Sequence, residues 1–419
     1  MRSLNSLAWI TGFIFIPALV GAQNKGSKAV TDFKKQSVAR IQSAYETYKD
    51  VALKIWSYAE VGYKEYKSSA LLQQTLRDNG FKIDTGVAEI PTAFVASFGS
   101  GKPVIGILAE FDALPGLSQD SVPVKKERAG VDAGHGCGHH LFGAASIAAG
   151  IELKKLMEAN RLGGTIKVYG CPAEEGGSGK VYMVKAGLFN GVDAVIHWHP
   201  GASNAVNAGT SMANLSAKFR FKGLSAHAAA SPEKGRSALD GVEAMDNMVN
   251  MMREHIPSDT RIHYVITRGG VAPNVVPDYA EVYYYVRNKD KDVVKSVFER
   301  VVNAAKGAAL GTGTTVEYEI TGGVYNLLHN VALARVMQKN LESVGGIQYS
   351  PADVEFAKQI QSSFSFKSPG YTTAALIDSA KDSKDATSGG STDVADVSWV
   401  VPTVGLSTAT WVPGTPAHS

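Results

Sequence analysis

A short stretch, residues 134–140, constrains this chain more than any other. It places the imidazoles of His135, His139 and His140 and the thiol of Cys137 within six residues, interleaved with glycines. Glycine allows sharp backbone turns, so side chains two residues apart can converge on one point. Cysteine and histidine together suit a borderline-soft divalent ion such as zinc. The alternative is a histidine-rich loop that binds nothing, and motifs elsewhere in the chain decide between the two.

Short apolar runs alternate with helical patterns on both sides of this stretch. With 44% apolar and 19% charged residues the chain has a globular composition, and 419 residues suffice for two domains. The alternation predicts a layered α/β domain. The predicted helices span residues 32–60, 67–79 and 181–186, and the predicted strands span residues 93–98, 104–108, 165–169 and 193–196.

Acidic and imidazole side chains follow three of these strands. Asp112, the pair Glu174 and Glu175, and His199 each come shortly after a predicted strand or at its end. Because ligands of α/β domains collect beyond the carboxyl ends of strands, these groups are expected to meet the cysteine–histidine stretch at one edge. Taken alone, the glutamate pair is typical of a solvated turn, and His197 is typical of a packed side chain. Convergence of three strand ends favours a ligand-binding site over an unrelated turn and a packed histidine.

The pattern changes from about residue 213. The predicted order becomes strand, helix, two strands, helix and strand, which is that of a ferredoxin-like βαββαβ module. We therefore expect an inserted second domain at residues 210–321, and a first domain with a mixed sheet made from residues 23–209 and 322–419. Methionines on a predicted helix at 237–254 indicate core or interface packing. The strands are predicted at 213–221, 261–267, 279–287 and 314–320, and the second helix at 292–305.

The N-terminus has the features of a secretory signal. Arg2 precedes a mostly apolar run over residues 7–20, and small residues lead to a cleavage point after Ala22. The run is short for a membrane span, so we expect an exported, periplasmic or secreted protein without membrane contact after cleavage of residues 1–22; an uncleaved anchor is the alternative.

In an oxidising compartment, a disulfide between Cys137 and Cys171 is the alternative to metal binding by Cys137. The net charge of +3 gives no reason to expect nucleic acid.

Several motifs resemble those of one known family, the metal-dependent amidohydrolases and peptidases that include aminoacylases, auxin-conjugate hydrolases and carboxypeptidase-like enzymes. The resemblance covers nearly the whole chain after the signal, and the cysteine-containing motif is specific to one branch of the family. The motifs lie at residues 109–115, 134–143, 172–180, 191–201 and 389–394.

The resemblance implies a catalytic domain that uses two divalent metal ions, Mn²⁺ or Zn²⁺. Glu174 matches the general base, which moves a proton from water to the leaving nitrogen. Asp112 matches a carboxylate that orients a ligand imidazole. Glu110 stands where the broader branch commonly has aspartate. The residues that match the metal ligands are Cys137, which replaces a bridging carboxylate, and His139, Glu175, His199 and His418.

The resemblance also implies that the inserted domain is a lid and dimerisation domain. His227 matches a histidine that reaches the partner subunit's site and stabilises an oxyanion. Asn274 and Arg287 match the groups that hold the substrate carboxylate. The implied assembly is a homodimer, with a related second subunit as a further partner. Family members continue with further helix past His418, so a C-terminally truncated catalytic domain is expected.

The implied function is hydrolysis of the amide bond of an N-acyl amino acid, with an aroyl-glutamate-like substrate. A dipeptidase or a general aminoacylase is the alternative among enzymes. A metal-bearing but inactive binding protein is the alternative of another class, and the presence of Glu174 argues against it, because a degenerate relative has no reason to keep the base.

Overall fold

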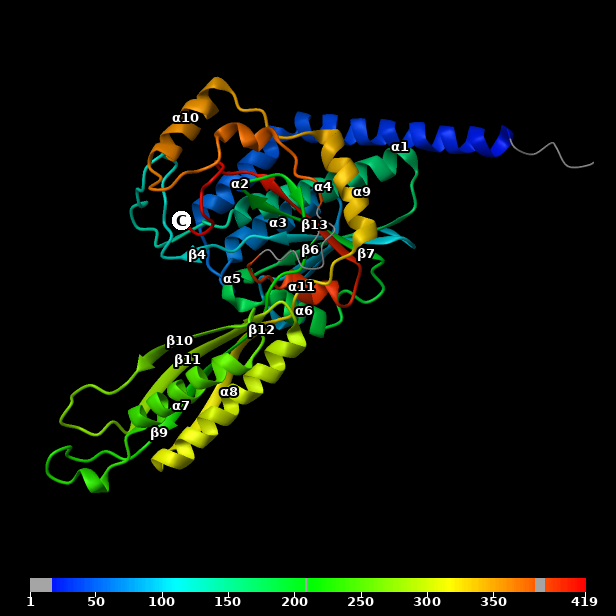
Figure 1. Cartoon of the computed structure of the whole chain (residues 1–419). Coiled ribbons are helices and arrows are strands. Elements are labelled where there is room, and N and C mark those ends of the chain that lie inside the picture. The colour runs from blue at the N-terminus through cyan, green and yellow to red at the C-terminus, as the bar shows by residue number, and fades with distance from the viewer. Residues whose placement is uncertain (1–16, 208, 381–388) are drawn as a thin grey trace, which may run out of the picture.

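The computed structural model describes residues 17–207, 209–380 and 389–419, which form two units (Figure 1). The larger unit, here called the head, is built on a seven-stranded sheet. A smaller, elongated unit with its own four-stranded sheet projects from the head (Figure 1).

The seven strands of the head lie in the order β1-β2-β6-β3-β7-β13-β8. The inner strands β6, β3, β7 and β13 run parallel, whereas β2, β1 and β8 pair antiparallel. The carboxyl ends of the parallel strands therefore lie at one edge of a mixed sheet. The strands are β1 (Lys82–Thr85), β2 (Phe94–Ser100), β3 (Val104–Glu110), β6 (Gly164–Cys171), β7 (Ala194–Gly201), β8 (Ala205–Val206) and β13 (Thr403–Ala409), with a separate pair, β4 (Leu114–Pro115) and β5 (Ala133–Gly134).

Helices cover both faces of this sheet. Because strand side chains alternate, Ile107 and Ala109 of β3 pack beneath α2, α3 and α4, while Leu108 packs on the opposite face with α6 and α11. Helix α9 covers the β13–β8 edge. The helices are α1 (Pro17–Ser43), α2 (Tyr45–Tyr58), α3 (Tyr66–Asp78), α4 (His139–Asn160), α5 (Glu174–Gly177), α6 (Gly179–Lys185), α9 (Val331–Val344), α10 (Pro351–Ser362) and α11 (Val394–Ser398), with 3₁₀ turns η1 (Val87–Glu89) and η4 (Tyr371–Ala375).

The smaller unit has an antiparallel sheet in the order β10-β11-β9-β12. Alternate residues of β11, such as Val282 and Tyr284, are buried with α7 and α8 in a single core. The intervening residues, Tyr283, Tyr285 and Arg287, therefore face the other side of the sheet. The elements are β9 (Ala213–Lys222), α7 (Ala238–Met252), β10 (Arg261–Arg268), β11 (Tyr279–Asn288), α8 (Lys291–Thr312) and β12 (Thr315–Val324), with 3₁₀ turns η2 (Pro232–Lys234) and η3 (Arg253–His255).

The predicted fold class is confirmed, with two local differences. The helix predicted over residues 32–60 is wrong as a single element, because α1 and α2 are separated at Ala44, where φ is −98° and ψ is 10°. The methionine stripe divides between two environments: Met245 is buried in the core, whereas Met248 is 41% exposed.

Part of the predicted signal segment, residues 1–16, lies outside the described residues, and residues 17–22 form the start of α1. In the described part of the chain, no helix combines the length and the apolar character needed to span a membrane.

Candidate metal centre

The carboxyl edge of the parallel strands brings the predicted site residues together. Glu110 ends β3, Asp112 follows it, and Glu174 and Glu175 begin α5 shortly after β6. His199 lies in β7, the neighbour of β3. Parallel pairing of β6, β3 and β7 thus places three strand ends side by side, as the sequence pattern predicted.

The cysteine–histidine stretch reaches this edge through a tight turn at the start of α4. Gly138 adopts a left-handed φ of 80°, and a Cβ atom there would lie 2.7 Å from Pro200. Glycine is therefore needed both for the turn and for the close approach to β7. The turn leaves Cys137 just before the helix and His139 in its first turn, on the side of the strand ends.

Two donor groups share the Cys137 thiolate position. In each group the candidate ligand atoms lie within 4.8 Å of one another: Cys137 with His139 and His199, and Cys137 with Glu175 and His418. The Cys137 Sγ atom lies 3.5 Å from His199 Nε2, and His418 Nε2 lies 3.2 Å from Glu175 Oε1. All five residues predicted as metal ligands therefore meet, in an arrangement that fits two cations joined by one sulfur atom.

The ring orientations in the first group turn the Nε2 atoms toward the other candidate ligands, with His139 Nε2 3.1 Å from Glu110 Oε2 and His199 Nε2 3.5 Å from Cys137 Sγ. His139 Nδ1 donates to Asp112 Oδ1 at 2.9 Å, and His199 Nδ1 donates to the carbonyl of Pro200 at 2.6 Å. Such a partner on Nδ1 fixes the tautomer and directs Nε2 at the metal. Asp112 also accepts the backbone N–H of Glu175 at 2.9 Å, so one buried carboxylate orients residues of both groups.

The electrostatics of the site favour positive charge. Burial opposes protonation of His139, but the carboxylates of Asp112 and Glu110 outweigh it and raise its pKa well above the ordinary value. Burial raises the pKa of Cys137 to about 12, so the thiol is neutral unless a cation stabilises the thiolate. Binding of a divalent cation would therefore release the thiol proton.

Glu174 lies beside both groups and also belongs to a third set of donors with Glu110 and His139. Burial raises the pKa of Glu174 well above its usual range, and the charges of Glu110 and Asp393 add to the effect. A carboxyl with a raised pKa holds a transferred proton more readily, which is the property required of a general base that later acts as an acid. A nearby cation would lower the pKa of Glu174. Burial and the cation together would bring this pKa toward the pH range in which a general base works.

Sequence reasoning missed a buried ion network behind the site. The ammonium of Lys180 contacts Glu110 Oε1 at 2.6 Å and Asp393 Oδ1 at 2.7 Å, and Glu110 Oε2 lies 3.1 Å from His139 Nε2. The network therefore holds Glu110 against a predicted ligand. Lys180 and Asp393 lie in two of the family motifs, which was the only signal for them in the sequence.

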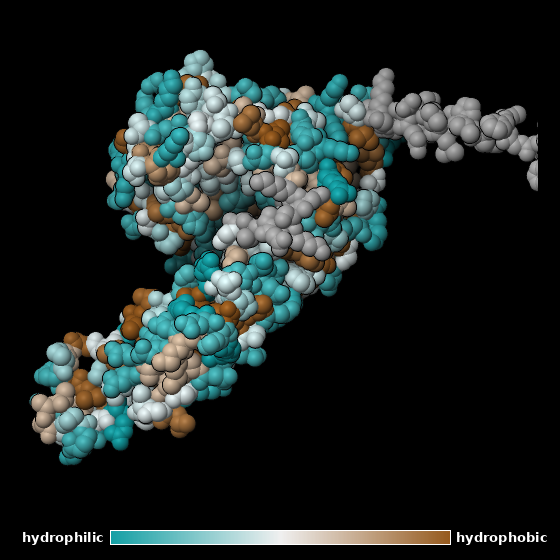
Figure 2. Space-filling view, in the orientation of Figure 1, coloured by the Kyte–Doolittle hydropathy of each residue, from teal (hydrophilic) through white to brown (hydrophobic). Residues whose placement is uncertain are grey.

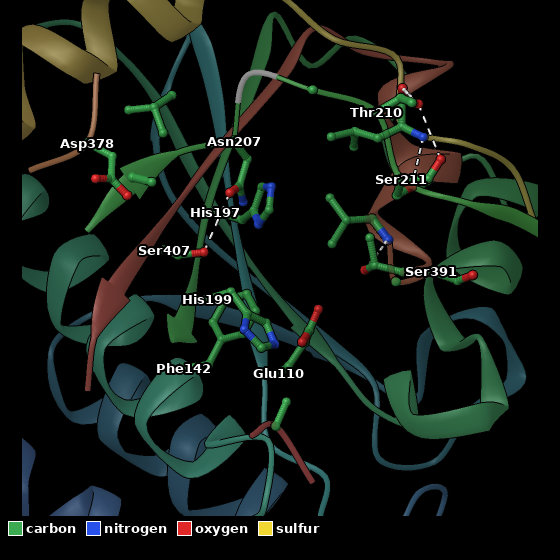
Figure 3. A pocket seen from close by; sticks show the side chains of 18 of the residues that line it. Glu110, Phe142, His197, His199, Asn207, Thr210, Ser211, Asp378, Ser391 and Ser407 are labelled. Carbon is green, nitrogen blue, oxygen red and sulfur yellow. Dashed lines mark hydrogen bonds between the residues drawn. The ribbon is translucent and has the colours of Figure 1, made fainter. Parts of the chain in front are cut away.

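A cavity of about 690 Å³ opens above the centre (Figure 3). Glu110, Phe142 and His199 form its floor at the metal centre. Figure 3 shows polar side chains on two facing walls, with His197, Asn207 and Ser407 on one and Thr210, Ser211 and Ser391 on the other.

The residues predicted from the smaller unit lie apart from this centre. Pairing of β9 with β11 places Lys222 opposite Tyr279 at the far end of the sheet, and Ala213 opposite Asn288 at the end where β9 leaves the head. The loops at the far end carry His227 and Asn274 and pack together, since Ala228 N donates to Asn274 O.

A ten-residue strand spans about 30 Å, so His227 and Asn274 do not reach the metal centre of their own chain. Arg287, near the head end of β11, lies at the opposite end of the sheet from Asn274. The three predicted substrate-binding and oxyanion residues are therefore not brought together within one chain. The exposed His227 nevertheless has a defined tautomer: Nδ1 accepts the backbone N–H groups of Ala229 and Ala230, so Nε2 carries the proton and can donate.

Comparison with known proteins supplies the family. Residues 210–312 match the model of the M20 peptidase dimerisation domain. Over 403 residues the chain is 39% identical to one of the subunits of p-aminobenzoyl-glutamate hydrolase from Escherichia coli (strain K12), covering 90% of this chain and 84% of that protein. The chain belongs to the M20 family. It is also 30% identical over 348 residues to the Xaa-Arg dipeptidase of Homo sapiens, covering 78% of this chain and 75% of that protein.

A solved structure of an M20 protein has the same fold. It is a dinuclear metal-binding peptidase from Bacillus subtilis, which matches with a TM-score of 0.59 and 18% identity over 88% of this chain and 89% of that one. The predicted family resemblance is confirmed, and the M20 protein described here is an enzyme that acts on amide bonds. The dimerisation-domain match supports oligomerisation. The roles of the individual site residues stay predictions.

Proposed function

We propose that this M20 enzyme hydrolyses the amide bond of an aminobenzoyl-glutamate-like N-acyl amino acid at a centre of two divalent cations. The observation that carries the proposal is the pair of donor groups that share Cys137, with Glu174 directly beside them. The substrate class is supported by the E. coli relative, which is named for the hydrolysis of p-aminobenzoyl-glutamate and matches over most of both chains.

The donor atoms suit two cations of intermediate softness. One group offers sulfur and two imidazole nitrogens, and the other offers sulfur, a carboxylate and an imidazole. Imidazole and thiolate favour Zn²⁺, while the carboxylate also accommodates Mn²⁺, so we propose one of these two metals. The ligand-type atoms already face one another in the described structure: Glu110 Oε2 lies 3.1 Å from His139 Nε2, and Glu175 Oε1 lies 3.2 Å from His418 Nε2. A bound cation would be coordinated by such atoms.

When bound, the two cations would activate the attacking water and polarise the scissile carbonyl. Glu174 takes a proton from that water and delivers it to the leaving amide nitrogen, which then departs as a free amine. The raised pKa of Glu174 allows it to hold the proton between these two transfers. Asp112 keeps the His139 ring in the orientation that the centre requires.

His227 and Asn274 act in the site of a neighbouring subunit. Nε2 of His227 donates to the oxyanion that develops at the scissile carbonyl. Asn274 and Arg287, supplied by different chains, hold the free carboxylate of the amino-acid half. The separation of Arg287 from the other two along β11 supports this division between two chains.

We propose a two-fold homodimer formed through the smaller unit. β10 is an edge strand whose unpaired backbone groups are available to a second chain, and Val265 on it is 55% exposed. Met248 and Met251 of α7 are also exposed, and hydrophobic residues are visible along this unit in Figure 2. In a two-fold interface each such patch meets its own copy. A related but different chain is the alternative partner, because the E. coli relative is named as one subunit of its hydrolase.

A dipeptidase is the second candidate, supported by the identity to Xaa-Arg dipeptidase. Export to the periplasm or outside the cell is proposed from the signal-like residues 1–22.

Glutamate release would be measured with metal-loaded protein on a panel of N-acyl amino acids and dipeptides. We expect p-aminobenzoyl-glutamate to be cleaved fastest and chelation to abolish cleavage. Absence of release from every N-acyl amino acid, or release that survives chelation, would contradict the proposed function.

A further inference from the structure

His197 has no role in the proposed chemistry, yet its position is unusual for a packed histidine. It is 7% exposed and lines the cavity above the metal centre, and neither of its ring nitrogens has a hydrogen-bond partner within the described structure. A ring nitrogen that no protein group pairs is available to a polar group of a ligand that enters the cavity. The sequence had suggested a packed side chain, which accounts for the burial but not for two unpartnered nitrogens.

The ring of His197 is seated by the neighbouring strand. Gly405 of β13 pairs with His197, and a Cβ atom at Gly405 would lie 2.1 Å from Nε2 of the imidazole. The absence of a side chain at residue 405 therefore gives the ring its place on the wall of the cavity. Figure 3 shows the imidazole beside Asn207, on the same wall as Ser407.

His197 lies at the right distance from the metal centre to contact a substrate. It precedes His199 by two residues on β7, so both side chains are on one face, about 7 Å apart along the strand. An acyl group whose carbonyl is held at the centre would extend past this wall. Val206 and Leu327 also line the cavity and supply apolar surface for an aromatic ring.

The charges around the cavity decide which half of the substrate enters it. Among the described residues that line it there is no lysine or arginine, whereas two carboxylates, Glu110 and Asp378, are present. Among the described lining residues, Asp378 would repel a substrate carboxylate and no cationic side chain would pair with it. The amino-acid half therefore points away from the cavity, and the acyl half enters it.

We propose that His197 is a specificity-determining residue that hydrogen-bonds a polar group on the acyl half of the substrate, such as an aryl amine. An imidazole offers one donor and one acceptor and can pair with an amine or a hydroxyl. The inference rests on the proposed function, because it assigns the acyl subsite of that same hydrolytic centre.

The test compares two substrates that differ in one polar group, p-aminobenzoyl-glutamate and benzoyl-glutamate. The wild type should favour the amino compound by roughly tenfold or more in kcat/KM, the scale of one well-placed buried hydrogen bond. His197→Leu should bring the ratio close to one. His197→Asn, which has nearly the same shape as leucine but can still hydrogen-bond, should retain most of the preference. Because the ratio is taken on one preparation, losses of folded or metal-loaded enzyme cancel.

Three results would overturn the inference: a wild-type ratio near one, an unchanged ratio in His197→Leu, or equal loss of preference in both variants. If the wild type cleaves neither compound, the proposed function fails separately. Calorimetric binding of p-aminobenzoate and benzoate to the metal-loaded protein then tests the subsite alone. Tighter binding of the amino compound that is lost in His197→Leu would support the inference, and equal affinities would reject it.

Discussion

The buried lysine behind the metal centre offers a sharp test of how the site is held together. Lys180 contacts Glu110 and Asp393, and all three side chains are at most 1% exposed. Replacement by methionine keeps most of the volume but removes the ammonium that two buried carboxylates share. Removal of one partner from a buried ion pair costs about 3–5 kcal/mol, so Lys180→Met should lower the free energy of unfolding by about that amount.

The assay is urea unfolding of the chelated protein at pH 8, followed by far-UV circular dichroism. Lys185→Met is a matched control, since it makes the same substitution at an exposed position of the same helix, α6. This control should stay within about 0.5 kcal/mol of the wild type. Addition of Asp393→Asn to Lys180→Met should recover part of the stability, because it removes one of the stranded charges.

The loss should also depend on pH. Without Lys180, burial raises the pKa of the carboxyls left behind, and the folded variant takes up protons that the unfolded chain does not bind. The variant therefore gains stability as the pH falls from 8 towards 5, and its difference from the wild type narrows. A cost below about 1 kcal/mol, or one equal to that of Lys185→Met, would refute the reasoning.

Three further predictions concern the site and the assembly. Glu174→Gln should keep near-normal metal content but lower turnover by roughly 10²–10⁴-fold. If the variant loses its metal instead, Glu174 is a ligand and Glu175 is the general base. Burial raises the pKa of Glu65 from 4.5 to about 7, so the folded state loses stability as the pH rises through this window. In urea unfolding, Glu65→Gln should gain about 2 kcal/mol relative to the wild type between pH 5 and 8, and parallel profiles would contradict this. Random mixing of Glu174→Gln with His227→Ala subunits should restore about a quarter of the activity, since each heterodimer has one intact site. Verified heterodimers that remain inactive would place His227 outside the partner's site.

The two-sheet architecture was predictable because helix and strand periodicities are local properties of the sequence. β8 and β13 were missed for physical reasons. β8 is only two residues long, and in β13 Gly405, Ser407 and Thr408 interrupt the apolar run that marks a buried strand. The break between α1 and α2 was missed because Ala44 is a strong helix former, and local propensity is only a weak guide to where a helix ends.

Glu175 and His199 could be predicted from their places after strands, because parallel strand ends converge, whereas His418 was expected only from the family resemblance. The Lys180–Asp393 pair could not be predicted, since 213 residues separate its members and no local pattern encodes such a contact. The same limit applies to Asn274 and Arg287, which resemblance grouped as carboxylate-binding residues but which β11 holds at opposite ends. Burial of His197 was foreseen, whereas its two unpartnered nitrogens are visible only in the folded cavity.

The metal stoichiometry of Cys137→Ser tests the central claim most directly, because Cys137 belongs to both proposed cation groups. After dialysis against limiting Zn²⁺ or Mn²⁺, elemental analysis of the wild type should give two ions per chain. The variant should lose affinity at both positions, and more for zinc than for manganese, since a hydroxyl is a hard and weak substitute for thiolate. A variant that retains both ions at wild-type affinity, or a Cys137–Cys171 disulfide in active protein, would contradict a centre built on a shared sulfur.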